Sequence, residues 1–249
     1  MTGGTDGDRP RVAVFRPDDD RLAAARARLD ELGAEAVGDP MLAVEPTGET
    51  PRDADYAVFT SKTGAELVAA AGWEPGRATV VAIGPKTAEA LEAAGYAVDL
   101  VPEEFSSTGL VDLLADRAAD ATVEVARSDH GSPVLLDGLR AAGADVHETV
   151  LYRLIRPEGA GESAALAAAG DLDAACFTSS LTVEHFLDAA AERGIRDAAV
   201  AGLNAAVVGV IGEPTRETAA GKGIDVDVVP DEATFEALAR ETVARLRGR

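Results

Sequence analysis

Residues 55–71 read DYAVFTSKTGAELVAAA, and residues 173–190 read DAACFTSSLTVEHFLDAA. Each stretch joins an apolar run to a polar turn and then to an amphipathic helix pattern, so one strand–turn–helix unit occurs twice. A second pair follows, VAIGPKTAEALEAAGYAVDLVP at 81–102 and VGVIGEPTRETAAGKGIDVDVVP at 208–230. A repeated unit of this size predicts two similar α/β lobes with a ligand cleft between them.

The spacing of the repeats differs at one place. Gly84 and Gly212 are 128 positions apart, whereas the FTS triplets at 59–61 and 177–179 are 118 apart. We therefore expect a loop of about ten extra residues between the two blocks of the second copy.

Alternating apolar runs and helical patterns indicate doubly wound parallel sheets with helices on both faces, as in flavodoxin-like folds. Strands are predicted at 98–101 and 146–152, among others. The first strand–helix–strand, 11–38, is too small to fold alone. It is expected to complete a lobe with residues 159–249, while residues 47–152 form the other lobe.

Two short segments are then predicted to cross between the lobes, residues 39–46 and residues 153–158. Two adjacent crossings would make a flexible hinge. The polar start, residues 1–10, has no apolar core typical of a secretion signal and is expected to be a disordered lead-in.

The composition is strongly acidic, with a net charge of −21 and only three lysines, Lys62, Lys86 and Lys222. This balance is typical of proteins from salt-accumulating halophiles, where salt screens the self-repulsion. An ordinary acidic protein is the alternative. The charge argues against nucleic acid or an anionic membrane as a partner. No apolar stretch reaches the roughly 18 residues of a membrane span, and the single Cys176 fits a reducing cytoplasm.

The chain has little conventional catalytic equipment. His130, His147 and His185 are scattered and show no metal-ligand spacing, and Cys176 lies inside an apolar strand as a core residue would. The sequence has no nucleophile elbow, phosphate-binding loop or dinucleotide fingerprint. No metal or cofactor is expected.

Polar helix starts instead follow the predicted strands. Each helix start offers free backbone N–H groups and about half a positive charge. Several of them directed into one cleft would bind a polyanion with few basic side chains. Taken singly, each could be a plain helix cap, but the whole pattern occurs twice, which favours a shared ligand.

In order and spacing, these blocks resemble the uroporphyrinogen-III synthase family over nearly the whole chain. The matching motifs are VAVFRP at 12–17, FTS at 59–61, AIGPKTAEALEAAG at 82–95, FSSTGL at 105–110, VARSDHG at 125–131, FTS at 177–179 and VIGEPT at 210–215. The resemblance implies two flavodoxin-like lobes joined by a two-strand linker, and a cofactor-free cyclising lyase. Its substrate would be hydroxymethylbilane, a linear tetrapyrrole with eight carboxylates, supplied by hydroxymethylbilane synthase.

The resemblance also implies roles for residues. Tyr152 matches the family's candidate acid for the departing hydroxyl; its alternative role is an aromatic that packs at the hinge. Candidate substrate-binding residues are Arg16, Thr60, Ser61, Lys62, Gly84, Lys86, Thr87, Ser106, Ser107, Thr108, Arg127, Ser128, Thr178, Ser179, Ser180, Gly212 and Thr215. The chain departs from the family pattern at Lys62, Ser180 and Glu213, and a Glu213 carboxylate pointing into the cleft would repel the substrate.

Two other functions are compatible with parts of the pattern. A non-catalytic two-lobed module could bind a polycarboxylate or tetrapyrrole without converting it, and would not need Tyr152. A nucleotide-sugar transferase would need diphosphate-binding glycine or basic clusters, which the sequence lacks. The working unit is expected to be a monomer, because no apolar helix face is left unassigned.

Overall fold

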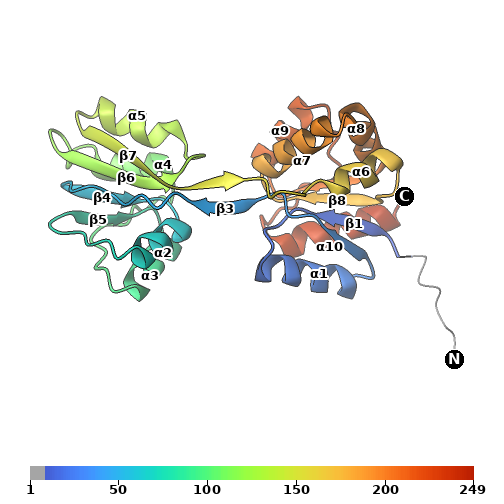
Figure 1. The fold of residues 1–249 in the computed structure, drawn as a ribbon, viewed down its shortest axis with the longest axis horizontal. Coiled ribbons are helices and arrows are strands. Elements are labelled where there is room, and N and C mark those ends of the chain that lie inside the picture. Colours follow the sequence, from blue (N-terminus) through green and yellow to red (C-terminus); the bar gives the residue numbers. More distant parts are fainter. Residues whose placement is uncertain (1–8) are drawn as a thin grey trace. The chain divides into compact units, whose positions relative to one another are not determined.

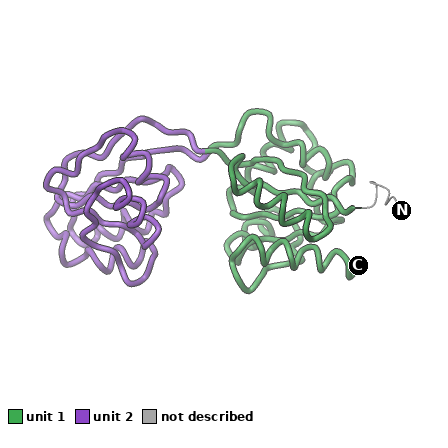
Figure 2. The backbone as a smooth tube through the Cα atoms, turned by 90° about the horizontal axis from the view of Figure 1, so that it is seen from below, with its two compact units in different colours: residues 1–43, 155–249 green, residues 44–154 purple. Residues whose placement is uncertain are grey.

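A computed structural model describes residues 9–249 (Figure 1). The predicted disordered lead-in falls mainly on residues 1–8, which lie outside the described residues. The backbone forms two compact units (Figure 2). Unit 1 combines the chain up to residue 43 with residues 155–249, and unit 2 holds residues 44–154.

Unit 1 contains a four-stranded, all-parallel sheet in the order β2-β1-β8-β9. Its strands are β1 (Arg11–Val14), β2 (Glu35–Gly38), β8 (Ala174–Phe177) and β9 (Val207–Val210). Its helices are α1 (Asp20–Glu31), α6 (Glu162–Ala169), α7 (Ser180–Glu192), α8 (Arg196–Ala205), α9 (Glu213–Gly221) and α10 (Phe235–Arg247).

Unit 2 contains a five-stranded sheet in the order β3-β7-β6-β4-β5, and the contacts among its last four strands are parallel. The strands are β3 (Ala43–Pro46), β4 (Tyr56–Phe59), β5 (Thr79–Ala82), β6 (Thr122–Ser128) and β7 (Asp145–Ile155). The helices are α2 (Lys62–Ala70), α3 (Pro85–Ala93), α4 (Ser107–Leu114) and α5 (Pro133–Ala141).

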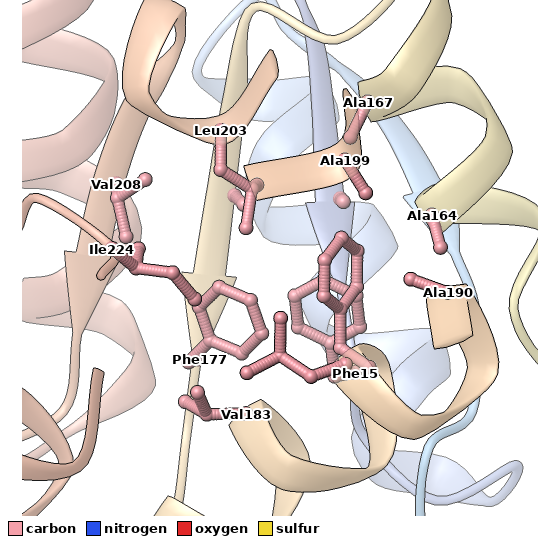
Figure 3. Packing of buried hydrophobic residues seen from close by; sticks show 14 of the residues in the cluster. Phe15, Ala164, Ala167, Phe177, Val183, Ala190, Ala199, Leu203, Val208 and Ile224 are labelled. Atoms are coloured by element: carbon pink, nitrogen blue, oxygen red, sulfur yellow. The ribbon is translucent and has the colours of Figure 1, made fainter. Parts of the chain in front are cut away.

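Both sheets are buried on both faces, which is why their strands read as continuous apolar runs. In unit 1 the odd and even residues of each strand belong to separate core clusters. Phe15 and Phe177 stack in this core with ring centroids 4.4 Å apart (Figure 3). Phe186 of α7 meets Phe177 edge-on. In unit 2, α2 and α3 cover one face while α4 and α5 cover the other. The predicted α/β class with parallel sheets and helices on both faces is confirmed.

The outer edge of each sheet is built in the same way. The predicted strand at 98–101 is wrong: Leu100 makes only one isolated bridge, to Val81. The reason is that the Asp99 carboxylate accepts the Val80 N–H at 2.8 Å and so replaces a backbone acceptor. Asp227 does the same for the Val208 N–H at 3.0 Å. The two aspartates are 128 positions apart, so this device belongs to the repeat.

The ten extra residues of the second copy form a helix, α8, and not the loop that the repeat spacing suggested. Ala199 and Leu203 are one helical turn apart and both are buried in the unit 1 core. At Gly202 the helix approaches α6 so closely that an added Cβ would lie 1.7 Å from the carbonyl oxygen of Ala167. The absence of a side chain at Gly202 therefore allows α8 to pack closely against the backbone of α6.

The strand predicted at 146–152 is longer than expected, since β7 continues to Ile155. Two contacts extend it. The Asp129 carboxylate accepts the Leu154 N–H at 3.0 Å, and β3 lies beside β7 in the sheet. Residues 43–46 and 153–155, which belong to the two predicted crossings, are therefore strand; the resemblance implied two strands there.

Asp39 ties two distant parts of unit 1 together. Its buried carboxylate accepts the N–H groups of Gly161, at 2.9 Å, and Ser163, at 2.8 Å, and also the Ser163 hydroxyl. These groups begin α6, so a residue 122 positions away in sequence caps that helix. A carboxylate accepting several hydrogen bonds in a buried site stabilises the fold strongly, because its removal leaves buried donors unpaired.

We expect Asp39→Ala to lower the free energy of unfolding by about 3 kcal/mol, because three donors at the start of α6 lose their acceptor. Asp39→Asn keeps one acceptor oxygen and should lose less. Asp188→Ala, on the exposed face of α7, is the control and should change stability by less than about 0.5 kcal/mol. Urea unfolding in molar KCl measures all three. Equal stabilities for Asp39→Ala and the control would contradict this role.

Candidate functional site

The predicted site residues lie where strands of the parallel sheets end and helices begin. In unit 1, Arg16 follows β1, Thr178–Ser180 follow β8, and Gly212 and Thr215 follow β9. Because parallel strands end at one edge of a sheet, the residues of each unit share that edge.

The predicted residues of unit 2 also share one edge. Thr60–Lys62 follow β4, Gly84–Thr87 follow β5, and Ser106–Thr108 begin α4 after the bridged outer segment. Arg127 and Ser128 end β6, and Tyr152 lies on β7. If the bridged segments count as strands, unit 1 has the order 2-1-3-4-5, and unit 2 has the order 5-4-1-2-3 beside the additional edge strand β3. In both sheets the strand order reverses between two central strands, β1 and β8 in unit 1 and β6 and β4 in unit 2, and doubly wound sheets bind ligands at that position.

Tyr152 and Ser61 meet at this position in unit 2. The Tyr152 side chain is 6% exposed, and its hydroxyl donates to Ser61 Oγ at 3.0 Å. A β-bulge directs it there, because the register between β6 and β7 shifts so that Ser128 pairs with Tyr152. Ser61 Oγ also accepts the Gly64 N–H at 3.0 Å. The Ser61 hydroxyl thus accepts twice, and its own proton is free to be donated.

The helix starts are of two kinds. Serine caps α2, α4 and α7, where Ser61, Ser106 and Ser179 each accept a backbone N–H of the first turn. By contrast, α3 and α9 begin at Gly84 and Gly212, have proline in the first turn and have no side-chain cap. The same difference occurs in both units. An uncapped helix start leaves backbone N–H groups for an anionic ligand.

The threonines after the two glycine turns are nearly inaccessible. Thr87 is 4% exposed and Thr215 3%. Both lie in the first turn of their helix, two residues after its start. In the same turn of α9, Arg216 Nε donates to Glu213 Oε2 at 2.8 Å. That hydrogen bond lowers the pKa of Glu213, and the carboxylate that seemed able to repel a ligand instead points along the helix.

Arg127 and Arg16 follow equivalent strands but differ in their contacts. Arg127 is 5% exposed, pairs with Glu148 at 2.6 Å and donates to the Ser132 carbonyl at 2.5 Å. Its charge is satisfied inside unit 2, so it holds the loop after β6 in place. Arg16 lies over the Phe235 ring, 4.9 Å from its centroid, and burial lowers the pKa of its guanidinium. Within residues 9–249 Arg16 makes no ion pair.

Two further predicted residues, Ser180 and Lys62, bond to nearby side chains or carbonyl groups. Ser180 donates to the Pro214 carbonyl at 3.1 Å and accepts from Thr218 at 2.9 Å, so it joins α7 to α9. Lys62 pairs with Glu66 at 3.3 Å. Lys62 and Lys86 line one groove of about 580 Å³ along α2 and α3.

The histidines and the cysteine are separate from these residues. His185 bonds the Met41 carbonyl, His130 is beside Asp129, and His147 is beside Asp145. The part of the chain that the structure describes contains no group of three or more His, Cys, Asp or Glu placed to bind a metal ion. No helix among these residues is long and apolar enough to cross a membrane. Cys176 is fully buried in β8, and burial raises the pKa of its thiol to about 12.

Together the strand order and the strand-end residues define a two-unit, doubly wound α/β protein in which both units carry equivalent residues at one edge of the sheet. Comparisons with known proteins give the family. The family model described as uroporphyrinogen-III synthase HemD matches residues 23–240. The putative uroporphyrinogen-III synthase of Methanothermobacter thermautotrophicus is 32% identical over 242 residues, covering 90% of this chain and 94% of that protein. The enzyme of Synechococcus elongatus is 26% identical over 230 residues, covering 88% and 86%.

Solved structures agree in fold. A mutant uroporphyrinogen III synthase from Thermus thermophilus has a TM-score of 0.70 at 21% identity, covering 96% of this chain and 100% of that one. The Helicobacter pylori enzyme has a TM-score of 0.62 at 16% identity, covering 95% and 99%. The chain belongs to the uroporphyrinogen-III synthase family, the cyclising lyases of heme biosynthesis.

Because Cys176 is fully buried with a raised pKa, we expect it to resist alkylation in the folded protein. Iodoacetamide at pH 8.5 should leave the native chain unmodified for hours and modify it completely after unfolding, as read by intact mass. The raised pKa also makes the stability of the fold depend on pH. The stabilisation that comes from keeping the Cys176 thiol protonated is complete below the ordinary thiol pKa and is lost as the pH rises toward about 12. Rapid native alkylation at pH 8.5 would show an accessible thiolate instead.

Proposed function

We propose that this chain converts hydroxymethylbilane into uroporphyrinogen III, with loss of water and inversion of the last pyrrole ring. The observation that carries the catalytic part is the hydrogen bond from Tyr152 to Ser61, at the doubly wound ligand position of unit 2. We assign no metal or cofactor to the reaction.

The first step is departure of the terminal hydroxyl, driven by electrons from the adjacent pyrrole nitrogen. Tyr152 is too buried to meet the substrate directly, whereas Ser61 is partly exposed and has a proton to donate. In the proposed step, Ser61 donates its proton to the leaving oxygen, the C–O bond breaks, and water departs. Tyr152 returns a proton to Ser61. The proton lost from a pyrrole carbon at ring closure passes to Ser61, whose own proton returns to Tyr152, so the protons balance over the cycle.

The second task is to hold the substrate in the fold that leads to isomer III. Uncatalysed closure joins the ends without inversion, so positioning decides the product. Eight carboxylates are available for this purpose. We assign them to helix starts of both units, above all the uncapped starts at Gly84 and Gly212, with Arg16 and Lys86 as cationic partners. Such sites need few basic side chains, which agrees with a chain of net charge −21.

We propose a cytoplasmic monomer that works at high salt and receives its unstable substrate from hydroxymethylbilane synthase. In support, the acidic excess would repel an octa-anion at long range unless salt screened it.

We expect a product-isomer assay in molar KCl to show the activity. Hydroxymethylbilane generated in situ should close to isomer I without the protein and mainly to isomer III with it, as porphyrins separated after oxidation. Isomer I in both arms, with the protein folded by circular dichroism, would rule out the proposed reaction.

Tyr152→Phe should lower kcat about 100-fold, because general acid assistance is worth at least that much. The product should remain isomer III, since the carboxylate sites are intact. Ser61→Ala should lower kcat similarly. The matched control is Tyr96→Phe, which removes another partly buried hydroxyl of unit 2, one that donates to the Trp73 carbonyl at 2.7 Å. A kcat for Tyr152→Phe within twofold of this control would contradict the acid role.

Sedimentation in molar KCl should give a mass near 25.5 kDa. Lowering KCl to tens of millimolar should reduce the melting temperature, because unscreened carboxylates repel one another. A mass of twice that value at micromolar concentration would contradict the monomer, and a melting temperature independent of salt would contradict the halophilic setting.

A further inference from the structure

Phe105 is the most exposed large apolar side chain among residues 9–249, at 60% exposure. It comes just before Ser106, the cap of α4, and its ring lies against the start of α3. A Cβ added at Gly84 would meet Phe105 Cβ at 3.2 Å and Cγ at 3.3 Å. Glycine at position 84 therefore lets the ring lie beside the helix start.

Phe105 is one wall of a cavity of about 340 Å³ whose other lining residues form the turn before α3 and its first turn. The lining residues are Ile83, Gly84, Pro85, Lys86, Thr87 and Phe105. The N–H groups of Thr87 and Ala88 bond the Gly84 carbonyl, and Pro85 has none, so the Lys86 N–H has no acceptor within the helix. Lys86 forms no ion pair within residues 9–249, although the chain is strongly acidic.

Thr87 is a further polar residue of the cavity. It is only 4% exposed and lines the cavity. Within the part of the chain that the structure describes, its hydroxyl has no protein hydrogen-bond partner, so a water or a ligand can pair with it. The cavity thus has a mainly apolar surface with an aromatic wall, and two of its lining residues, Lys86 and Thr87, carry an ammonium group and a hydroxyl.

The duplicated unit lacks this arrangement. The residue 128 positions after Phe105 is Ala233, and an added Cβ at Gly212 would meet nothing within 4 Å. The glycine turn, the uncapped helix and the buried threonine occur in both units, but the aromatic wall occurs in unit 2 alone. A flat apolar surface beside anion donors is suited to a planar ring that carries a carboxylate.

We propose that this cavity is a subsite for one carboxylate-bearing pyrrole ring, with the ring against Phe105 and its carboxylate on Lys86, Thr87 and the start of α3. That this ring belongs to hydroxymethylbilane rests on the proposed function. Because unit 1 offers carboxylate contacts without an aromatic wall, the subsite distinguishes one part of a repetitive substrate from the rest. Phe105 is then a specificity-determining residue that takes no part in proton transfer.

The test is Phe105→Ala, which should fold normally because the side chain is largely exposed. An aromatic contact contributes enough for the KM of hydroxymethylbilane to rise about 5-fold to 10-fold, with kcat changed less than twofold. The Kd of uroporphyrin III, measured by its fluorescence, should rise by the same factor. Phe105→Trp should restore both values. Val134→Ala, an exposed apolar position of α5 in the same unit, is the control and should change neither.

The outcomes separate this proposal from the proposed function. An active wild type whose Phe105→Ala variant matches Val134→Ala in KM and Kd would overturn the subsite and leave the function intact. A wild type that forms no isomer III but binds uroporphyrin III, with binding weakened by Phe105→Ala, would support the subsite and overturn the function. If wild type neither reacts nor binds uroporphyrin III, both are overturned.

Discussion

The structure depends on parallel strands that are buried on both faces. Such strands must all end at one edge of their sheet, and the helices that cover the faces must begin there. The result is a row of helix N-termini along that edge in each unit. Several features of the candidate site follow from this constraint: the serine caps, the uncapped glycine turns, and the arginines after β1 and at the end of β6. Little specialised chemistry is needed where the backbone itself supplies donors.

The two units reuse this plan with different details. Asp99 and Asp227 close the outer sheet edges identically, and Gly84 and Gly212 begin equivalent helices. The differences are therefore informative. Unit 2 has the Tyr152–Ser61 hydrogen bond and the exposed Phe105, whereas unit 1 has the extra helix α8 and an arginine over Phe235. The repeat gives the two units similar sheet edges, and the residues that differ between the units give those edges different side-chain contacts.

Tyr152 and Ser61 illustrate how position and role are linked. Tyr152 is part of the core of unit 2 as well as a hydrogen-bond donor at its ligand edge. The packing and catalytic interpretations of this tyrosine are thus compatible, since a buried ring fixes the position of its hydroxyl. The bulge between β6 and β7 sets that position, and the Asp129 contact to Leu154 holds the strand beyond it. In the proposed reaction, a proton donor held this firmly acts through an exposed intermediary, Ser61.

The sequence by itself determined the strand–turn–helix repeat, the α/β class and the placement of helix caps such as Ser61 and Ser179, because these depend on local apolar periodicity and turn chemistry. It also indicated the family through the order of its motifs. Only the tertiary structure decided that the ten-residue insertion is a helix, and that the Asp99 carboxylate takes the place of a backbone acceptor at the sheet edge. It also decided the ion pairs, in which Arg127 meets Glu148 and Glu213 meets Arg216. These outcomes depend on which side chains meet across the fold, and residue patterns along one chain do not contain that information.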